Sequence, residues 1–448
     1  MSTVGLSMIV KNEAKTIAAC LRSVSGVVSQ TVIADTGSID GTGTIARQLG
    51  AQVIEIPWAD HFAEARNAAL RLMETDWVLV LDADEELDDE AKQQIPRLLK
   101  KSNAGGYLVP IRNYIPTVSG RGWDRVAEPN RNSHPRARTA PAYFVHENCR
   151  LFRRDPEVYF VGRVHELVEP RICAVGGRLP MAKFCIHHFG QLAEEQERGR
   201  KAAAYRDLLR LKVQDSPDDA ISWIQLGLQE YECSRQAVEP LRCFDRALLL
   251  EPKATQAALF KGMIYLDLGE QKLAIESLDA AFPDERSQAL RQHLRGDALH
   301  NLGRLPEALT AYSHAVRLSG DDPILNSKLG YTEVRLGRSK SGIERIKNAA
   351  DKTPEVTEVR ERLMKAFIAI SSLSEAGEQA EILARLEGSA KAYLRAASIR
   401  VHAQQPKQAR EVLDRGIALF PDSVELRDAH NELAGESKGP ATMAATQS

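Results

Sequence analysis

The sequence predicts an α/β domain with a mostly parallel sheet, followed by an all-α array of stacked helix pairs. Two observations lead to this fold class. In the first 190 residues, short apolar strand patterns alternate with helical patterns, as in parallel sheets covered by helices. In the second half the strand patterns disappear, and residues recur with a spacing of 34 positions.

Composition limits the class of protein. The 448 residues include 59 Lys and Arg and 61 Asp and Glu, so nothing favours nucleic acid or an anionic membrane as the main partner. Six scattered cysteines without a Cys-x-x-Cys pair indicate free thiols. Residues 1–5 lack the pattern of a secretion signal, and no apolar run approaches the roughly 18 residues of a membrane span. We therefore expect a soluble, cytoplasmic chain.

The elements of the first part follow in regular order. We expect strands at residues 6–10, 31–34, 52–56 and 77–81. Helices are expected between them: one with Ile17, Cys20, Leu21 and Val24 on one face, one that ends at Gly50, and one through residues 62–70. Strands connected by helices run parallel, so polar residues at their carboxyl ends collect at one edge of the sheet. That edge is where open α/β sheets bind ligands.

The central strand, residues 77–81, ends at Asp82-Ala83-Asp84. Its five apolar residues predict burial on both faces. Residues spaced i, i+2 in an extended chain point the same way, so the two carboxylates should lie together. Clustered carboxylates at the end of a buried strand are costly unless a cation or water meets them, and oxygen ligands suit Mg²⁺ or Mn²⁺. The alternative is an acidic helix start, because further acidic residues follow.

Four motifs together resemble the inverting family-2 nucleotide-sugar glycosyltransferases of GT-A fold. They are Lys11-Asn12-Glu13, Asp35-Thr36-Gly37-Ser38-Ile39-Asp40-Gly41-Thr42, Ala65-Arg66-Asn67 and Asp82-Ala83-Asp84. Each follows a strand or lies in a helix in the family's order, over about the first 190 residues, which makes the combination far more specific than any single motif.

The resemblance implies roles for these residues. Asp35 would contact the nucleobase, and the nucleotide pocket would be lined by Lys11, Asn12, Glu13, Asp35, Asp40, Arg66 and Asp82. The divalent metal, Mn²⁺ or Mg²⁺, would be held by Asp84, Asp82 and His188. Two plainer interpretations stay open: residues 36–42 as a turn that caps the next helix, and Arg66 as a solvated helix residue.

The later part of the domain should meet the acceptor. We expect strands at 106–112 and 149–153, and a further apolar strand before His165-Glu166. Residues 119–141 are rich in Arg, Pro and Asn and are expected to form a loop or lid. In one interpretation the arginines of this segment approach the diphosphate of the donor. In the other, the segment is a mobile insertion without a role in the site.

His165-Glu166 is the candidate catalytic pair. The chain lacks the Glu-Asp pair and the Gln-x-x-Arg-Trp element of other family members, and it resembles the subgroup with His-Glu here, a later His and helical repeats. This implies Glu166 as the base with His165 beside it, and His187 or His188 at the metal or diphosphate.

Plainer alternatives exist for these residues too. Glu166 would pair with Arg163 or cap a turn, leaving Asp155 or Glu169 as the base, and one ring of the pair His187 and His188 would simply be buried. The irregular spacing of Cys173, Cys185 and the two histidines argues against zinc.

The 34-residue period identifies the second half as tetratricopeptide repeats. Gly262, Gly296 and Gly330 share this spacing, as do Gly269, Gly303 and Gly337, Ala247, Ala281, Ala315 and Ala349, and Phe244, Leu278, Tyr312 and Ile346. Small residues allow the two helices of a repeat to cross closely. We expect about six repeats, the fifth degenerate. The predicted domains are 1–190, a joining segment 191–218 containing a helix, the repeats 219–434 and a disordered tail 435–448.

These observations predict a metal-dependent inverting glycosyltransferase that uses a nucleotide-sugar, with a UDP-sugar favoured. The acceptor would be a peptide, protein or glycan, and the repeats would dock an acceptor, a partner protein or a second copy. One alternative is a repeat scaffold whose transferase domain is inactive. Another is a nucleotidyltransferase, which would need a Gly-rich triphosphate loop where this chain has Lys11-Asn12-Glu13.

Overall fold

The structure is a computed structural model that describes residues 2–100, 103–116, 121–122, 125–132, 134–192, 195–282, 287–433 and 435. The chain forms two compact units, Met1–Ala257 and Ala258–Ser448, and each is described by itself. Apart from Gly435, the predicted tail 435–448 lies outside the described residues. The boundaries expected near 190, 218 and 434 remain predictions.

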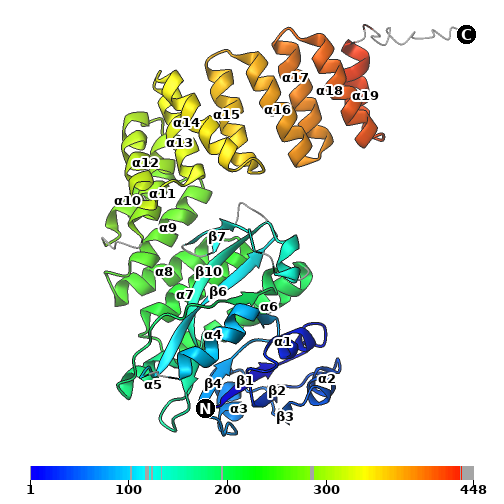
Figure 1. The fold of residues 1–448 in the computed structure, drawn as a ribbon. Coiled ribbons are helices and arrows are strands. Elements are labelled where there is room, and N and C mark those ends of the chain that lie inside the picture. The colour runs from blue at the N-terminus through cyan, green and yellow to red at the C-terminus, as the bar shows by residue number, and fades with distance from the viewer. Residues whose placement is uncertain are drawn as a thin grey trace, which may run out of the picture. The chain divides into compact units, whose positions relative to one another are not determined.

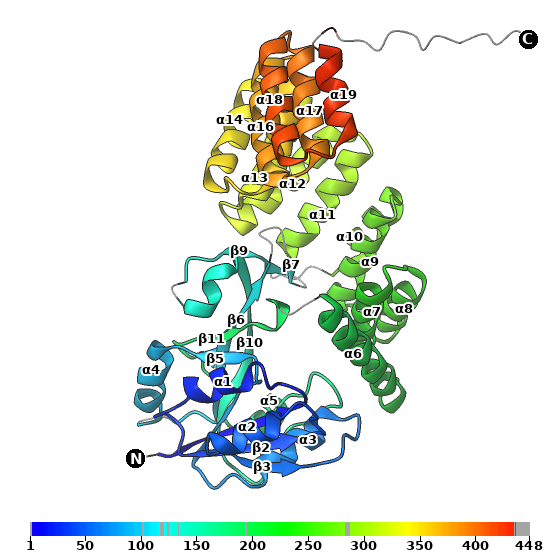
Figure 2. The same ribbon diagram turned by 90° about the vertical axis from the view of Figure 1, so that its right-hand side faces the viewer.

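The first unit is built on a mixed sheet (Figures 1 and 2). Four parallel strands lie in the order β3-β2-β1-β4, with bounds Gln52–Glu55, Gln30–Asp35, Val4–Val10 and Trp77–Val80. The sheet continues through β10 (Ala142–Arg153), β6 (Gly106–Ile115), β11 (Ile186–His188) and β5 (Glu85–Leu87). The predicted α/β class is confirmed, with the parallel strands in the amino-terminal half and the antiparallel strand β10 between β4 and β6.

Helices cover both faces of this sheet. One face packs against α1 (Ile17–Ser23), α2 (Thr42–Gln48) and α4 (Asp89–Leu99), and the other against α3 (Phe62–Leu70) and α5 (Glu169–Ala174). All four residues of β4 are buried, Trp77 and Leu79 toward the first face and Val78 and Val80 toward the second. The prediction of a central strand buried on both faces is confirmed.

The residues directly after Asp82-Ala83-Asp84 do not form the acidic helix start of the alternative interpretation. Glu85 and Glu86 do not begin a helix, because they lie in β5, which pairs with β11. The helix α4 begins only after Asp88, whose carboxylate accepts a hydrogen bond from Ala91 N–H at 2.7 Å.

The apolar strand expected before Glu166 is wrong. Residues 159–168 form an irregular loop with one isolated bridge between Val161 and Leu167. Gly162 and His165 have φ of 102° and 52°, and this left-handed conformation interrupts an extended strand. The loop therefore folds back on itself at His165-Glu166.

Only part of the segment 119–141 is described, and Trp123 lies outside it. The described part contains β7 (Arg121–Gly122), β8 (Arg125–Val126), β9 (Glu128–Pro129) and a 3₁₀ helix, η1 (Pro135–Thr139). Arg136 in this helix binds Glu86 at 2.7 Å and lies over the ring of Phe189. This arginine thus fastens the segment to the sheet.

The helix α6 (Glu195–Asp215) follows the sheet and packs within the first unit. Its residues Leu208, Leu209 and Val213 form an apolar cluster with Val164 of the loop 159–168 and with Leu226. Leu226 belongs to α7 (Ala220–Ser234), which pairs with α8 (Val238–Leu250). The first helix pair therefore shares a core with the loop that carries Glu166.

Further helices follow along the chain (Figure 1). They are α9 (Thr255–Asp267), α10 (Gln271–Ala280), α11 (Gln288–Asn301), α12 (Leu305–Ser319), α13 (Pro323–Arg335), α14 (Ser339–Lys352), α15 (Thr357–Ala369), α16 (Leu373–Glu387), α17 (Ala390–His402), α18 (Pro406–Leu419) and α19 (Val424–Leu433). A Cβ added at Gly296 would lie 2.6 Å from the ring of Tyr312, so a small residue is needed for the two helices to cross.

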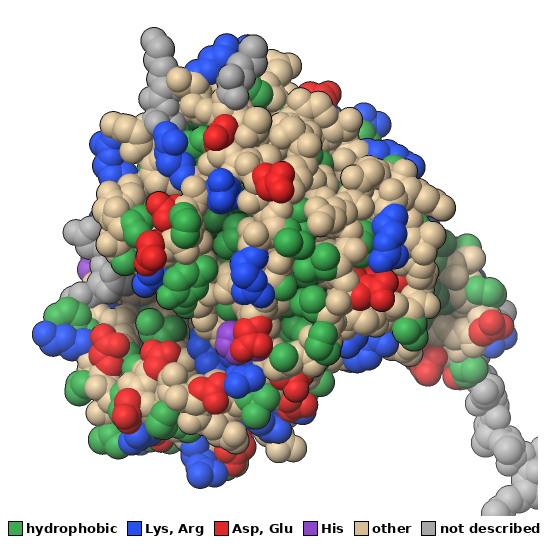
Figure 3. Space-filling model, turned by 90° about the horizontal axis from the view of Figure 1, so that it is seen from below, with side chains coloured by type: hydrophobic (Ala, Val, Ile, Leu, Met, Phe, Trp, Pro, Cys, Tyr) green, Lys and Arg blue, Asp and Glu red, His purple; other side chains and the backbone are tan. Residues whose placement is uncertain are grey.

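The distribution of surface charge and the composition of the helices bear on possible binding partners. On the face in Figure 3, acidic and basic side chains are interspersed rather than gathered by sign. Among the described residues, none of the helices combines the length and apolar character that crossing a membrane requires.

Candidate active site

The two aspartates after β4 have different surroundings. Asp82 is held by two buried arginines: Oδ1 accepts from Arg66 Nη2 at 2.8 Å and Oδ2 from Arg150 Nη2 at 3.1 Å. Asp84 Oδ2 instead lies 3.5 Å from His188 Nε2. The pair predicted from the sequence therefore divides into one carboxylate bound by guanidinium groups and one beside an imidazole.

Charge compensation keeps Asp82 ionised. Burial would raise the pKa of this carboxyl, but Arg66 and Arg150 outweigh it and lower the pKa below its usual range. Glu85 is buried behind it and pairs with Arg150 at 2.9 Å. For Glu85 burial dominates, and its pKa is raised.

Asp84 and His188 form a pair of donors that fits a divalent cation. The ring of His188 is fixed because its Nδ1 lies 2.7 Å from Oδ1 of Asn113 on β6. A Cβ at Gly190 would lie 2.6 Å from Asp84 Oδ2 and 2.7 Å from His188 Nε2, so a glycine keeps the space beside both donors open. Burial opposes a charge on His188, but the carboxylate of Asp84 prevails and raises the pKa of the imidazole to about 9.

His187 lies on the opposite face of β11 from His188. Its side chain is fully buried, and Nδ1 lies 2.8 Å from the hydroxyl of Tyr114. Of the two histidines, the structure therefore brings His188 to the aspartate pair.

Glu166 reaches the same cluster from the folded-back loop. Its Oε1 accepts a hydrogen bond from Arg66 Nε at 2.5 Å, so one guanidinium joins Glu166 to Asp82. Arg66 is 8 % exposed, and the interpretation of a solvated helix residue is wrong. Its Nη1 is buried and has no hydrogen-bond partner among the described residues.

The alternative pairing of Glu166 with Arg163 is also wrong. Arg163 pairs with Asp215 at 2.7 Å, on α6. Of the rival bases, Glu169 accepts hydrogen bonds from two backbone N–H groups, and Asp155 accepts one in an exposed turn. Only Glu166 of these three joins the aspartate cluster.

His165, next to Glu166 in the loop, lies against α6. The residue is partly buried, and its ring tilts against Tyr205 of α6, with ring centroids 6.1 Å apart. Burial, aided by Lys212, lowers the pKa of this imidazole.

The predicted nucleotide residues lie at the ends of β1 and β2. Asp35 Oδ1 accepts from the N–H groups of Gly37 and Ser38, which fixes this carboxylate at the strand end. Asn12 has φ of 58° and receives the N–H of Ile39 on its side-chain oxygen. The loops after the two strands are thus tied together.

Asp40 and Glu13 are bound within the protein. Asp40 accepts hydrogen bonds from Ala14 N–H and from Thr42, while the carboxylate of Glu13 binds Thr16 and Lys201 Nζ. Lys11, two positions before Glu13, is exposed. These contacts give Asp40 and Glu13 roles in shaping the edge of the sheet.

Sequence reasoning missed Arg150, Lys201 and Tyr205. Arg150 lies where the register of β10 shifts, between Cys149 and Leu151, and such a bulge re-aims a side chain. A charged residue inside the apolar run 149–152 was the available signal. Lys201 and Tyr205 lie on α6, outside the predicted transferase domain, where no motif marks them.

Comparisons with known proteins agree with this architecture. Residues 6–159 match the family Glycosyl transferase family 2, and residues 241–289 and 296–337 match tetratricopeptide repeat families. A TPR repeat-containing protein of Synechococcus elongatus is 31 % identical over 315 residues, which is 68 % of this chain and 69 % of that protein.

Two further matches cover less of the molecule. An uncharacterized glycosyltransferase of Rickettsia felis is 38 % identical over 108 residues, 24 % of this chain and 38 % of that protein. Among solved structures, a chain of the APC/C hetero-tetramer Cut9-Hcn1 is 19 % identical with a TM-score of 0.41, over 53 % of this chain and 46 % of that chain. The chain thus spans under half of the rickettsial relative.

Proposed function

The chain belongs to the family-2 glycosyltransferases and carries tetratricopeptide repeats behind its transferase domain, and we propose that it is a metal-dependent inverting enzyme acting on a nucleotide-sugar, specifically a UDP-sugar. One observation supports this most directly. Asp82, Asp84, Glu166 and His188 come from three distant segments and gather with Arg66 at the carboxyl end of β4.

Asp84 and His188 are the proposed ligands of Mn²⁺ or Mg²⁺. The carboxylate oxygen suits both ions, and the imidazole favours Mn²⁺. The bound ion would neutralise charge on the leaving diphosphate. Asp82 is assigned to the ribose side and to holding Arg66, because both of its oxygens already accept hydrogen bonds from arginines.

Glu166 is the proposed base. It would accept the proton from the acceptor nucleophile as that atom attacks the anomeric carbon, opposite the departing diphosphate. Arg66 orients Glu166 through Nε, and its Nη1 is the donor left for an anionic group of the substrate.

Asp35 is proposed to recognise the nucleobase. Two backbone N–H groups fix Oδ1, so the carboxylate holds one orientation in which it can accept from an imide N–H. Uracil offers such an N–H group, which is why we favour a UDP-sugar. The exposed Lys11 and Asn12 would border the same pocket.

The repeats are proposed to dock the acceptor, as a peptide, protein or glycan, or else a partner protein. Stacked helix pairs offer the extended surface that such docking needs. The cysteines of the described residues are free thiols, which supports a reducing compartment such as the cytoplasm.

The test is release of UDP from UDP-sugars by the full-length protein in the presence of Mn²⁺. We expect release that stops on chelation and is absent in Asp84→Ala. Asp89→Ala, an exposed residue in the first turn of α4, is the matched control. Failure of the parent protein to bind or cleave any of a panel of nucleotide-sugars would favour the inactive scaffold.

A further inference from the structure

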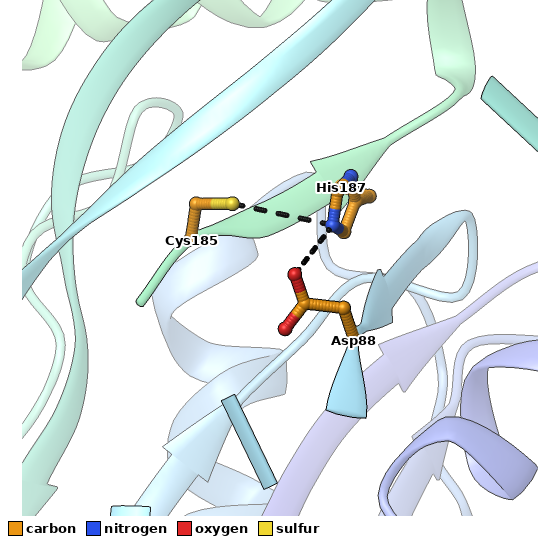
Figure 4. A group of neighbouring side chains, drawn as sticks. All are labelled: Asp88, Cys185 and His187. Atoms are coloured by element: carbon orange, nitrogen blue, oxygen red, sulfur yellow. Dashed lines mark hydrogen bonds and ion pairs between the residues drawn. The ribbon is translucent and has the colours of Figure 1, made fainter. Parts of the chain in front are cut away.

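A second cluster of metal-ligating side chains lies on the face of β11 that His187 occupies. His187 Nε2 is 3.2 Å from Asp88 Oδ2 and 4.0 Å from Cys185 Sγ, and the three donor atoms lie within 4.8 Å of one another (Figure 4). His188 does not belong to it, because side chains of neighbouring strand residues point to opposite faces, and Asp84 lies beside His188. The cluster is therefore separate from the candidate active site.

The spacing of these donors is close to the spacing around one bound ion. Metal–donor distances of about 2.0–2.3 Å in a tetrahedral zinc site place its ligand atoms roughly 3.3–3.6 Å apart. The two separations from Nε2 lie on either side of that range. A thiolate, an imidazole and a carboxylate together suit Zn²⁺ better than Mg²⁺ or Ca²⁺, which prefer oxygen ligands.

The imidazole is held in position for such an ion. The ring of His187 is fully buried and lies between Tyr114 and His134, with ring centroids 5.8 Å and 4.5 Å away. The hydroxyl of Tyr114 lies 2.8 Å from Nδ1, the kind of outer contact that fixes the tautomer of a metal-binding histidine. Nε2 is thereby left facing Asp88 and Cys185.

The carboxylate is held as well. Asp88 caps α4 through Oδ1, which accepts the N–H of Ala91, and this leaves Oδ2 for the cluster. Asp88 and Cys185 are partly exposed, so water can supply a fourth ligand.

We propose that Asp88, Cys185 and His187 bind a divalent transition-metal ion, Zn²⁺ above all, at a site distinct from the one at Asp84 and His188. The ion would join the start of α4 to β11. It would thus brace the pairing of β5 with β11, the strands next to Asp84 and His188. The positive charge of Arg112 acts electrostatically on both Asp88 and Cys185. The alternative to a bound ion is that Arg112 alone provides the positive charge for these two side chains.

The experiment uses the full-length protein, stripped of metal with a chelator and dialysed. We would titrate Zn²⁺ against a chromophoric chelator, and separately add Co²⁺ and record its thiolate charge-transfer absorption. The parent protein should bind at least one tight equivalent of Zn²⁺, which persists when Asp84 is altered, and show the cobalt–thiolate band. Cys185→Ser should abolish the band and weaken Zn²⁺ binding by about 100-fold or more, because loss of even an outer contact of a metal ligand costs about 10- to 100-fold.

Two variants make the result specific. Cys173→Ser removes an exposed cysteine on α5 and should keep both signals. Asp84→Asn should keep the zinc equivalent, because it alters only the proposed catalytic site. His187→Gln is a weaker test, since a buried ring is lost and the protein can misfold.

Two outcomes would overturn the proposal. One is a parent protein that binds no Zn²⁺ in competition with the chelator, which would leave Arg112 as the counter-charge. The other is a folded Cys185→Ser protein with unchanged zinc affinity. Neither outcome would affect the proposed transferase function, whose test depends on UDP release.

Discussion

Nε of Arg66 lies 2.5 Å from Oε1 of Glu166, although the two residues are 100 positions apart. The same guanidinium reaches Asp82, so one side chain of α3 connects the proposed base to the end of the central strand. This arrangement separates two kinds of effect. Replacing Glu166 should alter chemistry, whereas replacing Arg66 should also leave buried carboxylates uncompensated.

Glu166→Gln should lose sugar transfer by roughly 10²–10⁴-fold and bind donor almost normally. The amide oxygen can still accept from Arg66 Nε, so the loop should keep its position, but the amide cannot take a proton. Single-turnover transfer rates and UDP affinity would measure both effects. Glu157→Gln, on an exposed residue of the preceding turn, is the control. Transfer by Glu166→Gln at the parental rate would remove Glu166 from the mechanism.

Arg66→Ala should lower the free energy of unfolding by about 3 kcal/mol or more, because Glu166 is left buried without its cation. The matched control is Arg47→Ala on α2, whose exposed pair with Glu55 should contribute less than about 1 kcal/mol. Denaturant unfolding of the three proteins provides the comparison. Equal losses in both variants would mean that Arg66 is not a structural cation.

The sequence predicted where the carboxylates of Asp82 and Asp84 lie, but it did not predict all of the side chains that bind them. Asp82 and Asp84 were found because a strand buried on both faces has to end at the ligand-binding edge of the sheet. Arg150 was missed because its direction depends on a bulge, and its partners Asp82 and Glu85 are more than 60 positions away. Pairing across such distances is a property of the folded sheet and has no local pattern.

The irregular loop 159–168 was missed for a related reason. Its apolar residues favour a strand, but His165 adopts a left-handed conformation that only tertiary contacts can impose. Arg163 is tied to Asp215, and Phe160 exchanges two hydrogen bonds with Asn67 of α3. These contacts, from elements before and after the loop, outweigh its strand propensity.

Ending the chain at Gly190 should yield a protein that aggregates, because α6 covers apolar residues around Val164. The loss of Lys201 and Tyr205 would also expose Glu13 and Phe62. A chain ending at Ala257, the end of the first compact unit, should instead stay soluble without aggregating and bind UDP. Gel filtration and UDP titration of both would test this. A soluble 1–190 protein with full UDP affinity would contradict a role for α6.

In the second unit, Asp297 should make stability depend on pH. Burial would raise the pKa of its carboxyl, but Lys328 at 2.7 Å and His293 hold the pKa well below its usual range. A depressed pKa means that the stabilisation is complete above the unfolded value of about 4 and is lost as pH falls further. Asp297→Asn should therefore destabilise the repeats at pH 7. The stability of the variant should also fall less than that of the parent protein as the pH is lowered.

The control for this prediction is Asp279→Asn, because Asp279 forms a more exposed pair with Arg295. Thermal unfolding between pH 3 and 7 would be compared for the three proteins. Parallel curves for the parent and Asp297→Asn would show that Asp297 does not titrate below its normal range.

Gly190→Ala should weaken Mn²⁺-dependent UDP binding without removing any donor atom. The added methyl carbon would lie 2.6 Å from Asp84 Oδ2 and 2.7 Å from His188 Nε2, closer than non-bonded atoms allow, so one of the two donors has to move. A displacement of this size at a preorganised site costs about 10- to 100-fold in affinity or rate.

The matched control for Gly190→Ala is Gly199→Ala on α6, where an added methyl group meets no atom within 4 Å and should slightly stabilise the helix. Calorimetric titration of UDP with and without Mn²⁺ separates metal-dependent from metal-independent binding. Because position 190 contributes no ligand, a selective loss of the metal-dependent part would locate the ion beside Asp84 and His188. Unchanged binding in a folded Gly190→Ala protein would place the ion elsewhere.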